Sequence, residues 1–134
     1  MRVVLDTNVL LSGLATHGLS ESVLSLAFRD HQVVASEYIL DEVQRHLAGK
    51  FQVAPEKVER ALTLLRSQVE IVEPSPVPRD ACDDQDDLPI LGTAIAGRAE
   101  CIVTGDQDLL KLAHYQDVPL LSPRAFYERF RSDA

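Results

Sequence analysis

Acidic side chains stand at several points of this sequence where a strand is expected to end. Asp6 directly follows the apolar run at residues 3–5, and Asp106 comes shortly after the apolar run at residues 101–103. If these runs are neighbouring parallel strands, their carboxyl ends meet at one edge of the sheet, where open α/β proteins bind ligands. The two carboxylates would then converge at that edge.

Further acids can reach the same place. Glu42 lies at the border of the apolar face of a helix expected at residues 37–47. A run of acids before the helix expected at residues 90–98 adds Asp80, Asp83, Asp84, Asp86 and Asp87. Each acid also has a simpler interpretation, with Asp6 as a helix cap, Asp106 as a turn residue, and the others as solvated surface residues.

Carboxylates gathered at one site need cations, because like charges raise each other's pKa values. Mg²⁺ takes one or two carboxylates, keeps several waters and contacts substrate phosphate. Two such ions about 3.5–4 Å apart can activate a water and stabilise the leaving oxygen of a phosphodiester. The acids together therefore predict metal-dependent phosphodiester hydrolysis.

The composition bounds the class of protein. With 134 residues, 46% hydrophobic content and no Trp, we expect a single domain over residues 1–134 with an aliphatic core. The sequence shows no apolar run of about 18 residues and no signal peptide, so we expect a cytoplasmic protein without a membrane segment. Cys82 and Cys101 fit neither a zinc motif nor a disulfide framework.

The net charge is −8, from 13 Lys and Arg against 21 Asp and Glu. This balance argues against nucleic-acid binding by phosphate neutralisation alone. Metal ions at an acidic cluster would supply positive charge locally and weaken that objection. Five basic residues are candidates for phosphate contacts, although an ordinary solvated position explains each of them better: Arg45, Lys50, Arg79, Arg98 and Lys111.

The elements that must position these acids alternate along the chain. Short apolar strands are expected at residues 3–5, 33–35, 69–72, 101–103 and 118–121. Helices are expected at residues 8–14, 20–30, 37–47, 55–68, 90–98 and 109–113, and after Ser122-Pro123. This alternation predicts an α/β fold: a three-layer α/β/α sandwich with a central five-stranded parallel sheet.

Four parts of the sequence resemble PIN-domain proteins. They are Val4–Leu10, Glu42, the run Asp84–Asp87, and Ile102–Leu110 with its Thr-Gly-Asp-x-Asp-Leu-Leu pattern. The resemblance covers nearly the whole chain and is strongest to the toxin components of toxin–antitoxin pairs related to VapC-type ribonucleases. It implies a PIN-like fold, a metal-dependent endoribonuclease with RNA as substrate, and an antitoxin protein as partner.

The resemblance also implies a role for each matching position. An acidic quartet would bind Mg²⁺ or Mn²⁺ and carry catalysis: Asp6, Glu42, Asp87 and Asp106. Asn8 and Thr104 would orient these carboxylates by hydrogen bonds, and Asp84 and Asp108 would be secondary acids lining the site. Water held by a metal ion would attack the phosphodiester and leave a 5′-phosphate and a 3′-hydroxyl.

The third acid of the quartet is open among Asp84, Asp86 and Asp87. Asp87 is preferred because it stands four residues before Leu91 and can share its helical face. Pro89 disfavours helical geometry at the residue before it, so Asp87 can instead be a cap. The family usually has polar residues at positions 88 and 89, so a differently shaped entrance is expected here.

Two other functions fit parts of the pattern. A Mg²⁺-dependent phosphohydrolase of the haloacid-dehalogenase type needs a second acid two residues after Asp6, where Asn8 stands, and a later Lys motif that is absent. A catalytically inactive PIN-like module for RNA binding or assembly would not need an intact quartet. The apolar faces of the helices expected at residues 20–30 and 36–48 are compatible with a homodimer.

Overall fold

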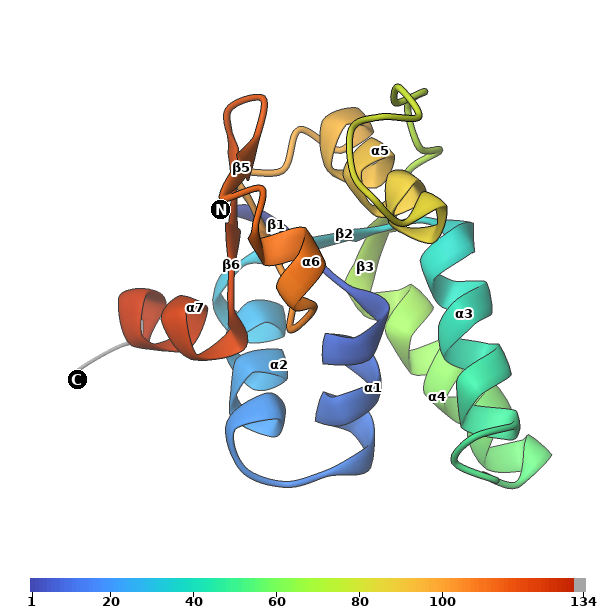
Figure 1. Cartoon of the computed structure of the whole chain (residues 1–134). Coiled ribbons are helices and arrows are strands. Elements are labelled where there is room, and N and C mark those ends of the chain that lie inside the picture. The colour runs from blue at the N-terminus through green and yellow to red at the C-terminus, as the bar shows by residue number, and fades with distance from the viewer. Residues whose placement is uncertain (132–134) are drawn as a thin grey trace.

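Six short strands form the centre of the fold. The computed structural model describes residues 1–131, and within them the strands form one sheet with the order β3-β2-β1-β4-β6-β5 (Figure 1). The strands are β1 (Arg2–Leu5), β2 (Gln32–Ala35), β3 (Val69–Ile71), β4 (Cys101–Val103), β5 (His114–Tyr115) and β6 (Val118–Leu121). β1 therefore lies in the interior of the sheet, between β2 and β4.

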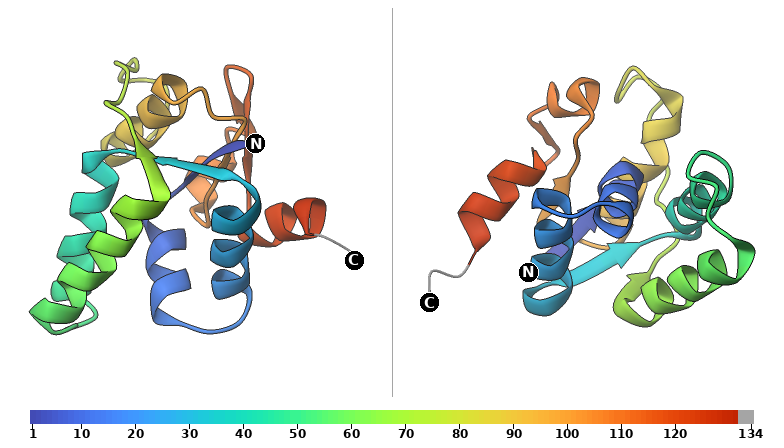
Figure 2. Two further views of the ribbon diagram at one scale, coloured as in Figure 1. Left: turned by 180° about the vertical axis from the view of Figure 1, so that it is seen from behind. Right: turned by 90° about the horizontal axis from the view of Figure 1, so that it is seen from below.

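Helices cover both faces of this sheet. They are α1 (Thr7–Ala15), α2 (Leu19–Asp30), α3 (Glu37–Ala48), α4 (Pro55–Gln68), the short 3-10 helix η1 (Gln85–Asp87), α5 (Leu88–Ala96), α6 (Gln107–Leu110) and α7 (Pro123–Phe130). Figures 1 and 2 show α1 to α4 on one face and α5 on the opposite face. The predicted three-layer α/β/α sandwich is confirmed.

The strands other than β5 are parallel, as predicted. Val4 of β1 pairs with Val34 of β2 on one side and with Ile102 of β4 on the other. β2 and β3 extend the sheet on one side of β1, while β4 and β6 extend it on the other. The carboxyl ends of β1 and β4 thus mark the switch point at which α/β sheets bind ligands.

β5 is a sixth strand beyond the five expected ones. It pairs antiparallel with β6, with His114 opposite Pro119. The helix expected at residues 109–113 is instead the earlier and shorter α6, and Ala113, with a left-handed φ of 61°, does not continue it. A strand of two residues is too short to show an alternating pattern, so no periodicity in the sequence marks it.

The core lies on both faces of β1. Val3, Val4 and Leu5 are at most 1% exposed, which explains why this strand is a continuous apolar run. Leu91 of α5 and Leu10 of α1 are buried to the same degree. A strand held this firmly on both faces gives a fixed position to the residue that follows it.

No helix among residues 1–131 is by itself long and apolar enough to cross a membrane. α1 and α2 reach the necessary length and hydropathy only as a pair, with a bend of 110° between them. Both helices contribute buried residues to the core described above.

Candidate active site

The carboxylate of Asp6 lies where β1 ends and α1 begins. The residue is 6% exposed. Its Oδ1 accepts a hydrogen bond from the backbone N–H of Thr7 over 2.7 Å, and its Oδ2 accepts one from Oγ1 of Thr104 over 2.7 Å. Asp6 is the N-cap of α1, so the helix-cap interpretation is confirmed, and the same carboxylate also lies beside the end of β4.

Thr104 connects the ends of β1 and β4. It is fully buried, and its Oγ1 donates to Asp6 while accepting a hydrogen bond from the backbone N–H of Asp106 over 3.0 Å. This contact follows from the strand register, in which Leu5 pairs with Val103. One hydroxyl thereby fixes the carboxylate of Asp6 relative to the turn that carries Asp106.

Asp106 is the partly buried N-cap of α6. Its Oδ1 accepts a hydrogen bond from the backbone N–H of Asp108 over 2.9 Å, so Oδ2 is the oxygen that remains for another ligand. The side chain of Asp108 is 61% exposed and forms an ion pair with Lys111 at 3.1 Å. Asp108 therefore contributes to this turn through its backbone.

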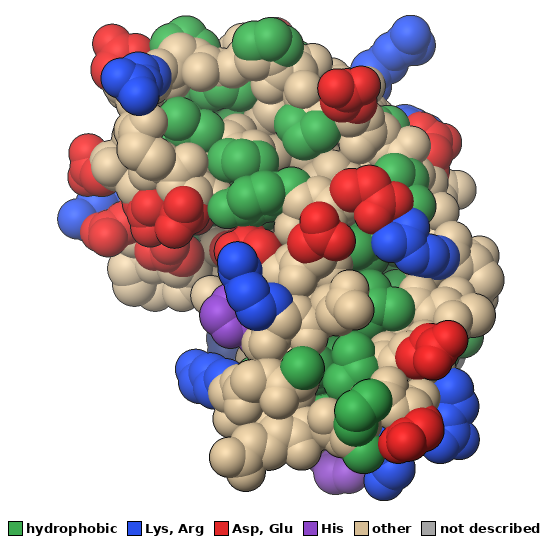
Figure 3. All heavy atoms as spheres, turned by 90° about the vertical axis from the view of Figure 1, so that its right-hand side faces the viewer, with side chains coloured by type: hydrophobic (Ala, Val, Ile, Leu, Met, Phe, Trp, Pro, Cys, Tyr) green, Lys and Arg blue, Asp and Glu red, His purple; other side chains and the backbone are tan. Residues whose placement is uncertain are grey.

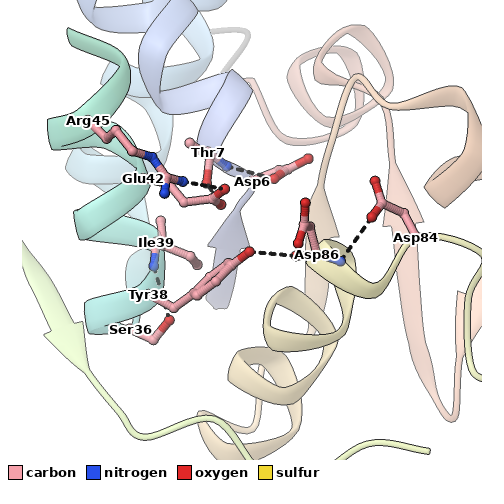
Figure 4. A network of polar contacts seen from close by, with 9 residues as sticks. All are labelled: Asp6, Thr7, Ser36, Tyr38, Ile39, Glu42, Arg45, Asp84 and Asp86. Atoms are coloured by element: carbon pink, nitrogen blue, oxygen red, sulfur yellow. Dashed lines mark hydrogen bonds and ion pairs between the residues drawn. The ribbon is translucent and has the colours of Figure 1, made fainter. Parts of the chain in front are cut away.

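Glu42 approaches the site from α3. Its Oε1 accepts a hydrogen bond from Oγ1 of Thr7 over 3.0 Å, and its Oε2 lies 3.5 Å from Nη2 of Arg45. Figure 4 shows Thr7 between the carboxylates of Glu42 and Asp6. Thr7 thus contacts two of the predicted acids, through its hydroxyl and through its backbone N–H.

In the structure Thr7, and not the expected Asn8, donates a hydrogen bond to an acid of the site. Asn8 is exposed, whereas Thr7 is 5% exposed and faces the acids. Neighbouring residues on a helix point about 100° apart, so the two side chains have different surroundings. The signal in the sequence was the position of Thr7 directly after the acid, at the first residue of the helix.

The acidic run ends in a turn that brings one acid inward. Asp84 caps η1, accepting a hydrogen bond from the backbone N–H of Asp86 over 2.9 Å, and both residues are exposed. Asp87 is 9% exposed and makes no side-chain capping hydrogen bond at the start of α5. Among the three candidates for the third acid, Asp87 is therefore the buried one.

Tyr38 of α3 holds this turn from the other side, and the sequence analysis missed it. Its hydroxyl donates a hydrogen bond to the backbone oxygen of Asp86 over 3.1 Å (Figure 4). Burial, followed by the charge of Glu42, raises the pKa of Tyr38 to about 12, so the hydroxyl stays protonated as a donor. Tyr38 stands one helical turn before Glu42, and this spacing was the available signal.

Burial and mutual repulsion raise the pKa values of two of the acids. The pKa of Asp87 rises to about 7, first by burial and then by the charges of Asp106 and Asp6. Burial also raises the pKa of Asp6, and the charges of Asp106 and Glu42 add to the rise. The hydrogen bonds from Thr104 and Thr7 lower this pKa in part. The charges of Asp106 and Asp6 therefore act on Asp87, and those of Asp106 and Glu42 act on Asp6.

The donor set is one that suits a hard divalent cation. Among residues 1–131, no three acidic, histidine or cysteine side chains already form a group that could enclose a metal ion. Mg²⁺ does not require such a cage, because one or two carboxylates and several waters commonly hold it. A cation here would also offset the repulsion that raises the pKa values of Asp6 and Asp87. The residues present therefore fit such a cation.

Known proteins share these sequence features and this fold. The PIN domain family model matches residues 2–108. No protein with a curated description matches the sequence significantly. The match covers the ends of β1 and β4, α3 and the acidic turn, which are the parts that carry the four acids.

The solved structures that are similar to the chain include VapBC2 and FitAcB. VapBC2 from Rickettsia felis, bound to a DNA fragment from their promoter, superposes with a TM-score of 0.65 at 20% identity, over 91% of this chain and 98% of that chain. FitAcB from Neisseria gonorrhoeae superposes with a TM-score of 0.60 at 21% identity, again over 91% and 98% of the two chains. At these identities the likeness shows a shared fold.

Proposed function

Because the chain belongs to the PIN domain family, we propose that it is a metal-dependent endoribonuclease and the toxin of a toxin–antitoxin pair. The observation that carries this proposal is that Thr104 and Thr7 hold Asp6 and Glu42 by hydrogen bonds at the end of β1, while the charges of Asp106 and Asp6 act on the buried Asp87. A carboxylate site at the switch point of a parallel sheet suits a cation that binds a phosphodiester.

Each acid has a role in this proposal. Asp6, Asp87 and Asp106 would bind Mg²⁺ or Mn²⁺, and Glu42 would complete the set from α3. When bound, the cation supplies positive charge to the scissile phosphate and lowers the pKa of a bound water. Asp6 would keep its position because both of its oxygens accept hydrogen bonds. The products would carry a 5′-phosphate and a 3′-hydroxyl.

An antitoxin protein is the proposed partner. The structurally similar VapBC2 was solved bound to a DNA fragment from their promoter. The motifs around Asp6 and Asp106 are those that resemble VapC-type toxins. We extend both likenesses to this chain and propose that a separate antitoxin chain binds it, and that it cleaves RNA in the cytoplasm.

A cleavage assay with single-stranded RNA tests this function. We expect cleavage with Mg²⁺ or Mn²⁺, loss of cleavage in excess chelator, and cleavage at only the background rate in Asp6→Asn. Asp41→Asn is the matched control, since Asp41 is an exposed acid on α3 next to Glu42. End-group analysis of the products checks the position of the phosphate.

Three results would contradict the proposal in different ways. Cleavage that survives in Asp6→Asn or in excess chelator would exclude these acids as the active site. RNA binding without cleavage would favour the catalytically inactive module. Hydrolysis of a small phosphomonoester without RNA cleavage would favour the phosphohydrolase.

A further inference from the structure

A shallow pocket of about 380 Å³ lies beside the acidic turn, where α3, the segment 73–77 and the start of α5 meet. Its apolar lining comes from Tyr38, Val77, Leu88 and Pro89, all partly buried. Figure 3 shows hydrophobic side chains gathered over the upper part of this face, with acidic side chains around them. The pocket is therefore an apolar surface within an acidic surrounding.

The walls of the pocket are fixed by contacts between the three segments. The hydroxyl of Tyr38 donates to the backbone oxygen of Asp86, which holds the ring against the acidic turn. The backbone N–H of Ser75 donates to the oxygen of Gly92 over 3.0 Å. A side chain at Gly92 would collide with the backbone oxygen of Ser75, so glycine allows the segment to lie close to α5. The pocket is thus formed before any ligand binds.

The pocket adjoins the turn that carries Asp87, because Tyr38 lines the pocket and donates to the backbone oxygen of Asp86. Leu88 of the pocket directly follows Asp87, and Tyr38 precedes Glu42 by one turn of α3. A strand with its phosphate at the acids would therefore carry a neighbouring nucleotide toward the pocket. The chain has a net charge of −8, which disfavours RNA binding by phosphate neutralisation. Apolar contact with an uncharged base does not depend on that charge.

We propose that this pocket binds one nucleobase of the RNA strand, next to the phosphodiester that the acids would cleave. The proposal rests on the proposed function. Aromatic rings stack on single-stranded bases without regard to sequence, and Tyr38 offers such a ring. Glu73 lines the same pocket and can accept a hydrogen bond from an exocyclic amino group. Cytosine carries that group and uracil does not, so the pocket prefers cytosine to uracil.

Binding of short oligocytidylate and oligouridylate to Asp6→Asn tests the pocket without cleavage of the RNA. In this background, Tyr38→Leu is expected to weaken binding roughly five- to a hundredfold, because the leucine cannot stack on a base. Tyr38→Phe keeps the ring and loses the hydrogen bond to the turn. Its affinity for the oligonucleotides should therefore lie between that of Asp6→Asn alone and that of Tyr38→Leu. Fluorescence anisotropy at one fixed salt concentration measures all of these affinities.

Two further variants keep the test independent of the folding of Tyr38→Leu. Glu73→Ala, at an exposed position, should reduce the preference for oligocytidylate over oligouridylate several-fold. Phe51→Leu is the matched control, because Phe51 is a partly exposed ring beyond the far end of α3. This variant should bind the oligonucleotides as tightly as Asp6→Asn alone does.

The outcomes separate the pocket from the proposed function. Unchanged binding in Tyr38→Leu together with an unchanged base preference in Glu73→Ala would overturn the pocket, even if the wild-type protein cleaves RNA. Tyr38-dependent binding by a wild-type protein that does not cleave would support the pocket and contradict the nuclease. A wild-type protein that neither binds nor cleaves RNA would overturn both.

Discussion

Oγ1 of Thr104 lies 2.7 Å from Oδ2 of Asp6, although 98 positions separate the two residues in the chain. The hydrogen bond joins the ends of two neighbouring parallel strands, and both partners are almost completely buried. A hydrogen bond to a buried charged group is stronger than one between neutral groups. This contact therefore does more than stabilise the sheet, because it sets the direction of a carboxylate at the proposed metal site.

Thr104→Val keeps the shape of the side chain and removes its hydroxyl. We expect Mn²⁺ affinity to fall about 10- to 100-fold, as is usual when a partner of a metal ligand is lost, and cleavage to fall with it. Calorimetric titration and the cleavage assay measure both. Thr93→Val is the matched control, since Thr93 is equally buried but donates to Ser36. Equal losses in the two variants would show that destabilisation, and not carboxylate position, is the cause.

Thr7 and Asn8 are the two candidates for the residue that orients the acids. Thr7→Val removes the donor to Glu42 while leaving the backbone N–H that donates to Asp6, so we expect a several-fold loss of cleavage at subsaturating metal. Asn8→Ala should have the smaller effect because Asn8 is exposed. Metal titration of activity in both variants gives the ranking, and the reverse order would support Asn8 as the orienting residue.

The parallel sheet and the meeting of Asp6 with the segment after β4 could be predicted from the sequence. Both depend on continuous apolar runs, which mark strands buried on both faces, and on the rule that parallel strands end at one edge. The inward position of Asp87 was only one of three alternatives. Burial separates it from Asp84 and Asp86, and that burial depends on how the turn packs against the rest of the fold.

The contacts that involve Thr7 and Tyr38 could not be predicted in the same way. Each joins segments that are far apart in the chain, so the partner depends on helix orientation in three dimensions. Local sequence indicates a helix start at Thr7 and an amphipathic helix around Tyr38, but it does not indicate which oxygen each hydroxyl contacts. β5 was not predicted because a strand of two residues is too short to show an alternating apolar pattern.

The raised pKa of Asp87 predicts how the metal-free protein responds to pH. Because its pKa rises from 3.8 to about 7 on folding, the folded state favours the protonated acid. Its contribution to stability is therefore greatest at low pH and is lost as the pH rises toward 7. Asp87→Asn should abolish this part of the pH dependence in chelator. Thermal unfolding across this range measures it, and identical slopes for both proteins would contradict the prediction.

Mg²⁺ should favour the ionised form of Asp87, whereas folding without metal favours the protonated form. The cation binds the ionised carboxylate, so it competes with the proton and stabilises the wild-type protein more at higher pH. Asp87→Asn should show a smaller rise in melting temperature on addition of Mg²⁺. A rise equal to that of the wild-type protein would exclude Asp87 as a metal ligand and favour Asp84 or Asp86 as the third acid.

His31 lies far from the acids, between the end of α2 and β2, and packs against the C-terminal helix. Its ring centroid is 5.6 Å from that of Phe126 and 5.7 Å from that of Phe130. Among the described residues, its two ring nitrogens have no hydrogen-bond partner and are shielded from solvent. Burial and the N-terminal ammonium lower the pKa of His31, against the charges of Asp30 and Glu100.

The lowered pKa of His31 predicts acid sensitivity of the packing of α7. Because the folded state disfavours the imidazolium, the stability from this group is complete above the unfolded pKa of 6.5 and is lost as the pH falls below it. His31→Phe retains the aromatic contacts and cannot ionise, so its melting temperature should fall less than that of the wild-type protein between about pH 8 and about pH 5. His114→Phe, at an exposed position, is the matched control and should follow the wild-type protein. The same acid-induced drop in His31→Phe and the wild-type protein would show that a different group causes it.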